Sequence, residues 1–513
     1  MRLLVLLWLV SLALAQNSKC DPVRVRKPWS LLTAAEKKTY VEAVGKAMAS
    51  GYHHQFVEIH TEPSSEAEAH GCMFIYWHRK FLLAYENMLR SLDPAYECLT
   101  IPYWDYATLS SSYVSGSCSS IYSCDSGIIN AFGGNINGNV RRSWDSVNGD
   151  KISASACVAN NPLNNFCQSS SAYQNKRCMG CVPRNDFSRA RVPAEANIAS
   201  VFNQVLGGSN SRTGKTLDEA TRGIQQGCHN TIHANIGATM GTFESPADPL
   251  FYLHHAQVDL LHRIYFKCNV ADAKRGVKPV LSKTQKTKSS DAKIWTNCAR
   301  YDGSGINPTD PVRMIVGEKG GKKWNVNDPN SPLNKFFKDL PLSYSDYIDG
   351  DDLGSFSYQY QYTGMLADML TKCKSFVVPR RASLMEGEAE ESYPINPNYI
   401  DRCVERPRLA CEILQTSFID YLSGAAGYYG WSQDTLAEQL DALLCVHHEE
   451  CLGGCSDYSA EFKANFHPKG PPRCKVIMDK LKNRELFIEL PNWRKVMANF
   501  FPCGDEQALL DEE

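Results

Sequence analysis

One region of the chain reads His229-Asn-Thr-Ile-His233 and then Asp248-Pro-Leu-Phe-Tyr-Leu-His254-His255-Ala-Gln-Val-Asp259. His229 and His233 are four residues apart, so on a helix both imidazoles project from one face and can meet at one ion. His255 then comes from a second element, where Asp259 is expected to accept the remaining N–H of an imidazole and fix its orientation. The region therefore predicts a metal ion held between helices.

A second group of three histidines lies earlier, in His60 and in His70-Gly-Cys-Met-Phe-Ile-Tyr-Trp-His78-Arg79. We expect His78 to open a helix and His60 and His70 to lie in the loop before it. Three neutral imidazoles per ion, without a cysteine or carboxylate ligand, suit copper or zinc. One His-x-x-x-His pair is common on helices, and one set of three histidines also serves catalytic zinc. The zinc-protease motif His-Glu-x-x-His is absent, and two such sets among only thirteen histidines indicate a pair of metal ions.

The first fifteen residues predict a secreted protein. Arg2 precedes an apolar run from Leu3 to Leu14, and Ala13-Leu-Ala15 is a small-residue cleavage pattern. The run is shorter than the ~20 apolar residues of a membrane helix, and no later stretch reaches that length. The net charge of −2 excludes strong attraction to nucleic acid or to anionic membranes. We expect a soluble, extracellular protein that binds neither.

The twenty cysteines fit an oxidising compartment and predict disulfides, whose connectivity the sequence leaves open. Cys178-Met-Gly-Cys181 resembles a redox motif, but structural disulfides are the better interpretation in a secreted chain. His447 and His448 lie near cysteines in a pattern that imitates a zinc cluster, and disulfides explain those cysteines as well.

The chain length predicts two or three domains. Residues 1–15 are assigned to the signal peptide, 16–375 to a catalytic domain, 376–395 to a charged linker and 396–513 to a cysteine-rich helical domain. Within the second of these, Thr108 to Arg184 is rich in Ser, Gly and Asn and holds six cysteines, which predicts a disulfide-braced insertion.

Several segments predict particular elements. Thr33 and Glu36 form a capping-box pattern for a helix that runs to about Ala49. The alternation in Tyr358-Gln-Tyr360-Gln-Tyr362 predicts a short strand. Further helices are expected near Trp77 to Leu89, Pro193 to Leu206 (closed by Gly207-Gly208) and His254 to Lys267.

The segments Phe74–Glu86 and Asp248–Asp259 resemble the two copper signatures of the tyrosinase family, which includes catechol oxidases and molluscan haemocyanin units. Ile101-Pro-Tyr-Trp-Asp105, Met240-Gly241 and the tyrosines of 358–362 are similar to further motifs of the family. The resemblance covers about Cys20 to Leu370. It implies a mainly α fold, in which an antiparallel four-helix bundle holds two copper ions in a dicopper centre.

The resemblance also implies the ligands of the two ions. These are His60, His70 and His78 for copper A, and His229, His233 and His255 for copper B. His53 and His54 are rivals for the first position, where His60 is preferred because it lies nearest the motif. His254 is then a neighbour of the ligands, and His262 has a structural role.

The chain departs from the family pattern at two places beside the copper ions. Glu68 stands where several branches carry a cysteine bonded to a histidine, so no thioether is expected, and Cys72 is expected in a disulfide. Gly207 stands near the position of an acidic residue that helps to hold a water near copper B. Glu219, Gln225 and Gln226 are candidates to replace that acid.

Three more residues bear on the substrate. Asn230 resembles the family residue that orients the water which deprotonates monophenols, and this favours tyrosinase activity. Phe243 matches a residue over the copper pocket, where it restricts substrates or stacks on their ring. Ala234 adds no charge to select acidic substrates.

The resemblance implies a tyrosinase that uses O2 to hydroxylate monophenols and to oxidise o-diphenols to o-quinones. Alternatives are a catechol oxidase acting on o-diphenols only, a dioxygen carrier of the haemocyanin kind, and a zinc-bound relative. One further hypothesis is that the C-terminal domain covers the pocket until a protease cuts near Arg380-Arg381. The alternative is a permanent stabilising module. The physiological phenol, with melanin formation among the candidates, and the oligomeric state stay open.

Overall fold

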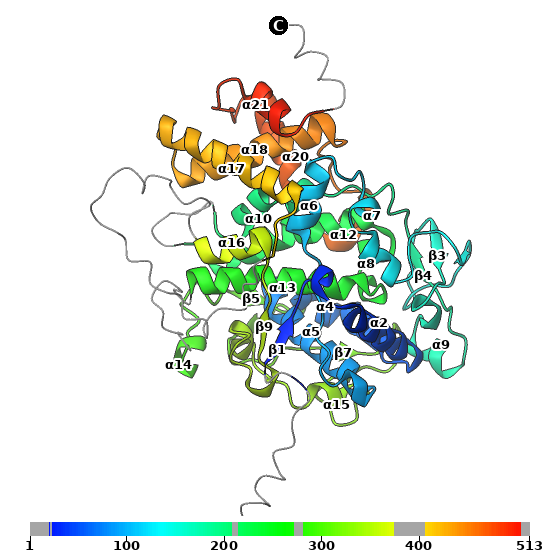
Figure 1. Cartoon of the computed structure of the whole chain (residues 1–513). Coiled ribbons are helices and arrows are strands. Elements are labelled where there is room, and N and C mark those ends of the chain that lie inside the picture. The colour runs from blue at the N-terminus through cyan, green and yellow to red at the C-terminus, as the bar shows by residue number, and fades with distance from the viewer. Residues whose placement is uncertain (1–19, 21–22, 208–213, 271–280, 374–405, 504–513) are drawn as a thin grey trace, which may run out of the picture.

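The computed structural model describes residue 20 and residues 23–207, 214–270, 281–373 and 406–503 (Figure 1). The signal peptide, the linker with Arg380-Arg381, and Gly208 lie outside the described residues. Helices dominate, as expected. The longer ones are α2 Ala34–Ala49, α3 His53–His60, α4 Pro63–Ala69, α5 Phe74–Ser91, α6 Tyr106–Val114, α10 Ile198–Val205, α11 Leu217–Ile224, α12 Asn230–Ile236, α13 Leu250–Asn269, α16 Gly364–Lys372, α17 Ala410–Tyr429, α18 Gln433–Cys451, α19 Ala460–Phe466, α20 Arg473–Lys482 and α21 Trp493–Phe500. Short helical pieces are α7 Ile121–Cys124, α8 Ser126–Ala131, α9 Ser170–Gln174, α14 Lys283–Lys286 and α15 Asn334–Phe337.

The strands are short, with two or three residues each. Parallel pairing joins β1 Arg24–Arg26 to β9 Tyr358–Tyr360, so the predicted tyrosine strand is confirmed. The other pairings are antiparallel: β2 Val140–Arg141 with β3 Ala156–Val158, β3 with β4 Val182–Arg184, β5 Cys298–Ala299 with β6 Gly305–Ile306, and β7 Ile315–Val316 with β8 Trp324–Asn325.

The four-helix bundle is centred on α5 and α13, which pack against each other, and α3 and α12 place His60 and His233 beside His78 and His255. Both α5 and α13 are buried nearly all round. Among their buried charges, Arg79 pairs with Asp259 between the two helices, and Glu86 and Arg263 pair with residues of other segments. The helix α2 begins as predicted, since Thr33 Oγ1 accepts a bond from the Glu36 N–H and the Glu36 carboxylate accepts one from the Thr33 N–H. Asp93 and Pro94 follow the end of α5.

Two predicted positions were wrong. His60 is the last residue of α3 rather than part of a loop, and α5 begins at Phe74, so His78 lies in its second turn. Only His70 fits the expectation in part, because it caps the short helix α4. The helix begins at Phe74 because this buries the aromatic residues before His78. A boundary placed at the histidine motif does not take this burial into account.

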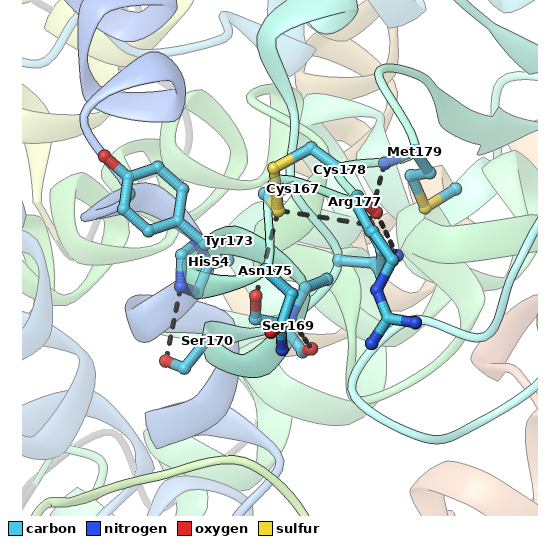
Figure 2. Close-up of a disulfide and its surroundings, with 12 residues drawn as sticks. His54, Cys167, Ser169, Ser170, Tyr173, Asn175, Arg177, Cys178 and Met179 are labelled. Carbon is cyan, nitrogen blue, oxygen red and sulfur yellow. Dashed lines mark hydrogen bonds between the residues drawn. A yellow bond between two sulfur atoms is a disulfide. The ribbon is translucent and has the colours of Figure 1, made fainter.

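The predicted insertion is braced by disulfides as expected: its six cysteines form the pairs Cys118–Cys124, Cys157–Cys181 and Cys167–Cys178. Figure 2 shows the last of these beside α9, where the Ser170 hydroxyl faces Nε2 of His54 at 3.3 Å and the Tyr173 ring packs on that imidazole. His54 therefore joins α3 to the insertion.

The remaining disulfides tie distant parts of the chain. They are Cys20–Cys98, Cys72–Cys298, Cys268–Cys373, Cys451–Cys503 and Cys455–Cys474. Cys72 is disulfide-bonded, as predicted. Cys178 and Cys181 pair with other partners, which supports their structural interpretation.

The helices α17, α18, α20 and α21 gather on one side of the molecule, at the top of Figure 1. There α17 packs on α6, and α18 packs on α10. Glu412 of α17 accepts a bond from the Thr108 hydroxyl of α6 at 3.2 Å. No helix among the described residues is long and apolar enough to cross a membrane.

Candidate metal centre

The first three histidines meet where α3, α4 and α5 converge. The ring centroids of His60 and His70 are 4.9 Å apart, and those of His60 and His78 are 5.6 Å apart. Nε2 of His60 lies 3.5 Å from Nε2 of His78. Both nitrogens of His70 are buried and have no hydrogen-bond partner.

The second three histidines meet between α12 and α13. His229 ends a π-helical turn, Gln225–His229, that joins α11 to α12. Nε2 of His233 lies 3.4 Å from Nε2 of His255, and the centroids of His229 and His233 are 4.6 Å apart. The two groups are adjacent, because the rings of His78 and His255 stack at 4.1 Å. The fold thus brings together all six predicted ligands.

His254 also belongs to this second group, since its ligand atom lies within 4.8 Å of those of His229, His233 and His255. Its Nδ1 is hydrogen-bonded to the Tyr106 hydroxyl, and its Nε2 is buried without a partner. Sequence reasoning missed Tyr106, which follows the Ile101–Asp105 motif directly. Nothing in its type or spacing indicates contact with His254.

Hydrogen bonds to backbone carbonyls fix which nitrogen is free in three of the imidazoles. Nδ1–H of His60 donates to the Phe243 carbonyl at 2.7 Å, and Nδ1–H of His78 donates to the Phe74 carbonyl at 2.9 Å. Nδ1–H of His233 donates to the Met240 carbonyl at 2.5 Å. Each Nε2 therefore carries a lone pair toward the centre of its group.

Facing lone pairs repel each other unless a cation lies between them. This is the arrangement of His60 Nε2 and His78 Nε2. In the second group, Nδ1–H of His229 donates to Asn230 Oδ1 at 2.8 Å, and His229 Nε2 is buried without a partner. The residues present thus fit two ions that accept imidazole nitrogen, with backbone carbonyls orienting the rings.

Burial keeps these imidazoles neutral, which metal binding requires. It lowers the pKa of His60 to about 4, although the bond to Phe243 acts in the opposite direction. Burial likewise lowers the pKa of His229 to about 4. The pKa values of His70, His78, His233 and His255 fall well below 6.5 for the same reason.

The predicted role of Asp259 was wrong, because its carboxylate binds no imidazole. It accepts bonds from Arg79 Nε at 2.8 Å and from the hydroxyls of Tyr358 and Tyr360 at 2.5 and 2.8 Å. Arg26 Nη1 lies 3.4 Å away. Asp259 therefore joins α13 to α5, β1 and β9. Although Asp259 lies one helical turn from His255, its carboxylate binds the buried arginines instead, because a buried charge needs a partner of opposite charge.

The other candidate histidines have structural partners. Nδ1 of His53 is 2.9 Å from the Tyr85 hydroxyl. His262 Nδ1 accepts a bond from Arg79 at 2.9 Å, in line with its predicted structural role. His447 Nε2–H donates to the Val114 carbonyl, and its neighbour Cys451 is disulfide-bonded.

The residues considered as replacements for the missing acid do not place a carboxylate in the pocket. Glu219 is exposed and caps α11 through Thr216. The Gln225 side chain donates to the His70 carbonyl at 2.8 Å, and the Gln226 carbonyl accepts a bond from Tyr458. Glu68, at the position where several branches of the family carry a cysteine, forms an ion pair with Arg300.

Two phenylalanines cover the histidines. The Phe243 ring lies 4.7 Å from that of His70. The Phe466 ring, at the end of α19, lies 5.2 Å from His233, 5.5 Å from His70 and 5.2 Å from Phe243. Sequence reasoning missed Phe466, because it comes from the C-terminal segment without family motifs and only the tertiary fold brings it here.

Comparison with known proteins agrees with this geometry. The common central domain of tyrosinase matches residues 50–267. The tyrosinase of Streptomyces glaucescens is 31% identical over 245 residues, which cover 46% of this chain and 80% of that protein. A tyrosinase-like protein of Diaporthe leptostromiformis is 27% identical over 267 residues, which cover 47% of this chain and 63% of that one.

Among solved structures, latent apple tyrosinase aligns with a TM-score of 0.32 and 13% identity, covering 67% of this chain and 63% of that chain. The family therefore rests on the sequence matches and not on this alignment. Membership implies a copper centre, with which both histidine groups are compatible. The chain belongs to the tyrosinase family.

Proposed function

We propose that this protein is a secreted copper oxidase that uses O2 to hydroxylate monophenols and to oxidise o-diphenols to o-quinones. The observation that supports it best is the pair of adjacent histidine groups, in which imidazole lone pairs converge in a buried space. His60, His70 and His78 would hold one copper, and His229, His233 and His255 the other. The bound copper pair would supply the reaction with O2 and the transfer of electrons.

The chain itself provides orientation and a dry pocket. The carbonyls of Phe74, Phe243 and Met240 hold three imidazoles in one tautomer, so their lone pairs are directed before any ion arrives. The Phe243 ring beside His70 offers an aromatic face on which a phenol ring can stack. This apolar surface favours uncharged aromatic substrates.

Hydroxylation of monophenols additionally requires that the phenol lose its proton. Asn230 is the candidate to orient the water that accepts this proton. Its amide oxygen accepts the bond from His229 Nδ1 and, with its second lone pair, can still accept a bond from a water. The alternative is a catechol oxidase that acts on o-diphenols only. The exposed position of Glu219 supports this alternative, because Glu219 then supplies no acid beside the histidines.

We also propose that the intact chain is latent. Phe466 is only 8% exposed and lies against two histidines from different groups, so it occupies space that a phenol would need. Cleavage near Arg380-Arg381, outside the described residues, is one way to release α19.

Oxygen uptake by the copper-loaded full-length protein tests these proposals, with L-tyrosine and then L-DOPA as substrates. We compare the unmodified chain with Phe466→Ala and with Phe487→Ala, a control phenylalanine in the same unit that is 62% exposed. Uptake with both substrates supports the tyrosinase, and uptake with L-DOPA alone supports the catechol oxidase. A faster rate only in Phe466→Ala supports latency.

Equal rates in all three proteins would contradict latency, and no uptake in any of them would contradict the oxidase. The metal-to-protein ratio, measured by mass spectrometry, separates copper from the zinc alternative. Secretion is tested separately, by sequencing the N-terminus of protein recovered from culture medium. A mature chain that begins at Gln16 is the expected result.

A further inference from the structure

The loop that carries Phe466 is closed at its base by a disulfide. Cys455 follows α18 and Cys474 lies in the first turn of α20, and their bond spans a sequence separation of 19 residues. The helix α19 lies inside this loop, with Phe466 as its last residue. The disulfide therefore anchors the segment that covers the histidines.

Beside this disulfide lies a third cysteine with a free thiol. Cys445, in α18, is 1% exposed, and its sulfur lies within 4.8 Å of those of both Cys455 and Cys474. Three sulfur atoms at this separation can exchange partners with small side-chain movements, because exchange needs only a thiol that can approach a disulfide sulfur.

A cavity gives access to this group. It measures about 260 Å³, lies between the C-terminal helices and the catalytic body, and has Cys455 and Cys474 in its wall. Thr231 and Ala234 of α12, the helix that carries His233, also line the cavity. A small thiol or a hydroxide ion can thus reach the disulfide from solvent.

The same loop is held to the catalytic body at both ends. The Tyr458 hydroxyl donates to the Gln226 carbonyl at 3.1 Å, just before α19. The Cys474 N–H donates to Glu195 Oε1 at 2.8 Å, just after it. Release of Cys455 from its disulfide should therefore loosen the Tyr458 end of the loop, because Tyr458 follows Cys455 by three residues.

We propose that Cys445, Cys455 and Cys474 form a thiol–disulfide exchange site that controls how firmly α19 is held over the histidines. The Cys445 thiolate attacks the Cys474 sulfur, a Cys445–Cys474 bond forms, and the Cys455–Cys474 bond breaks. Cys455 leaves as a thiolate and takes up the proton that Cys445 lost. One disulfide replaces another, so no oxidant or reductant is consumed.

The direction of exchange follows from where the three residues lie. Cys445 and Cys474 are buried on α18 and α20, which pack together, so their bond joins two fixed helices. Cys455 lies in the partly buried loop at the cavity wall, where a leaving thiolate is hydrated. Burial, with Asp441 and Glu195 nearby, raises the pKa of the Cys445 thiol, so its thiolate forms rarely and the direct attack is slow. An external thiol speeds the exchange as a catalyst and is released unchanged at the end.

Disulfide mapping of the intact full-length protein tests the exchange. The protein is incubated in a buffer of reduced and oxidised glutathione, quenched with acid, alkylated and digested without reduction. We expect a Cys445–Cys474 peptide and alkylated Cys455, which are absent in Cys445→Ser and present in the control Cys411→Ser, another buried free thiol. If Cys455–Cys474 is the sole pairing of these residues after incubation, the proposal is wrong.

Hydrogen exchange of the backbone amides in residues 460–466 tests the consequence. Their exchange should accelerate several-fold in the glutathione-treated protein and stay unchanged in Cys445→Ser. A new disulfide without faster amide exchange would overturn the link to α19. Neither measurement uses copper or enzyme activity, so both results are independent of the proposed oxidase. Only the conclusion that the exchange regulates an oxidase rests on the proposed function.

Discussion

At the scale of single residues, Asp259 shows how charge is stabilised inside the bundle. Burial alone raises the pKa of a carboxyl, but Arg79 and Arg26, with the hydroxyls of Tyr358 and Tyr360, lower the pKa of Asp259 to about 2. We predict that Asp259→Asn lowers the free energy of unfolding by about 3–5 kcal/mol, because it leaves buried arginine charge without its partner. Urea denaturation at neutral pH measures this loss.

The acid dependence of the same residue has a defined sign. Because the folded pKa is depressed below 3.8, the carboxylate stabilises the fold above that value and loses its contribution as the pH falls toward about 2. The variant should lack this dependence. Asp339→Asn, at an exposed aspartate, is the control and should change stability by less than about 0.5 kcal/mol. A similar effect in both variants would refute the argument.

His254 and His255 are neighbours in the same group, and hydrogen bonding predicts which one binds metal. Burial raises the pKa of the Tyr106 phenol, so its O–H stays protonated and can donate to His254 Nδ1. The proton of neutral His254 is then on Nε2, which cannot ligate. We predict that His255→Gln lowers bound copper from about two ions to about one per chain, whereas His254→Gln keeps about two.

Elemental analysis of dialysed protein provides this measurement. Tyr106→Phe serves as an additional check. Without the Tyr106 hydroxyl, the proton of His254 can lie on either ring nitrogen, while the imidazole itself stays in place. Copper loss in His254→Gln, with retention in His255→Gln, would reverse the assignment.

At the scale of elements, local sequence determines the ends of helices where a cap is present. Both bonds of the Thr33–Glu36 capping box are formed at the start of α2. Thr33→Ala should therefore lower the free energy of unfolding by about 1 kcal/mol, measured by urea denaturation. Thr33→Ser keeps the hydroxyl and should retain most of this stability, so an equal loss in both variants would exclude capping as its cause.

Local sequence patterns predict part of this fold, and contacts between distant segments determine the rest. Helices with strong periodicity or caps, the tyrosine strand, the braced insertion and the convergence of the histidines follow from local pattern and family motifs. The partner of Asp259 depends on which arginines fold beside it, and the position of Phe466 on how α19 docks. Neither leaves a signal in residue spacing, since contacts between distant segments arise from packing.

At the scale of the whole molecule, the C-terminal helices and the catalytic body meet through buried polar groups as well as apolar ones. Glu195, on the catalytic side, is 3% exposed and accepts the bond from the Cys474 N–H of α20. Burial raises its pKa to about 7, although this bond and Arg473 act in the opposite direction. The interface therefore contains a buried carboxyl whose protonated form is favoured more in the folded chain than in the unfolded chain.

Stability across this interface should consequently depend on pH. Because the folded pKa lies above 4.5, the folded chain binds more protons than the unfolded one, and stability falls as the pH rises from about 4.5 to 7. Over this interval Glu195 contributes a loss of up to about 3 kcal/mol, since one pKa unit corresponds to about 1.4 kcal/mol. Glu195→Gln keeps an acceptor for Cys474 but carries no charge, so its unfolding free energy should fall less between pH 5 and 8 than that of the unmodified chain. Parallel pH profiles for the two proteins would show that the carboxyl ionises without cost, and that the C-terminal helices are held by apolar contacts and disulfides instead.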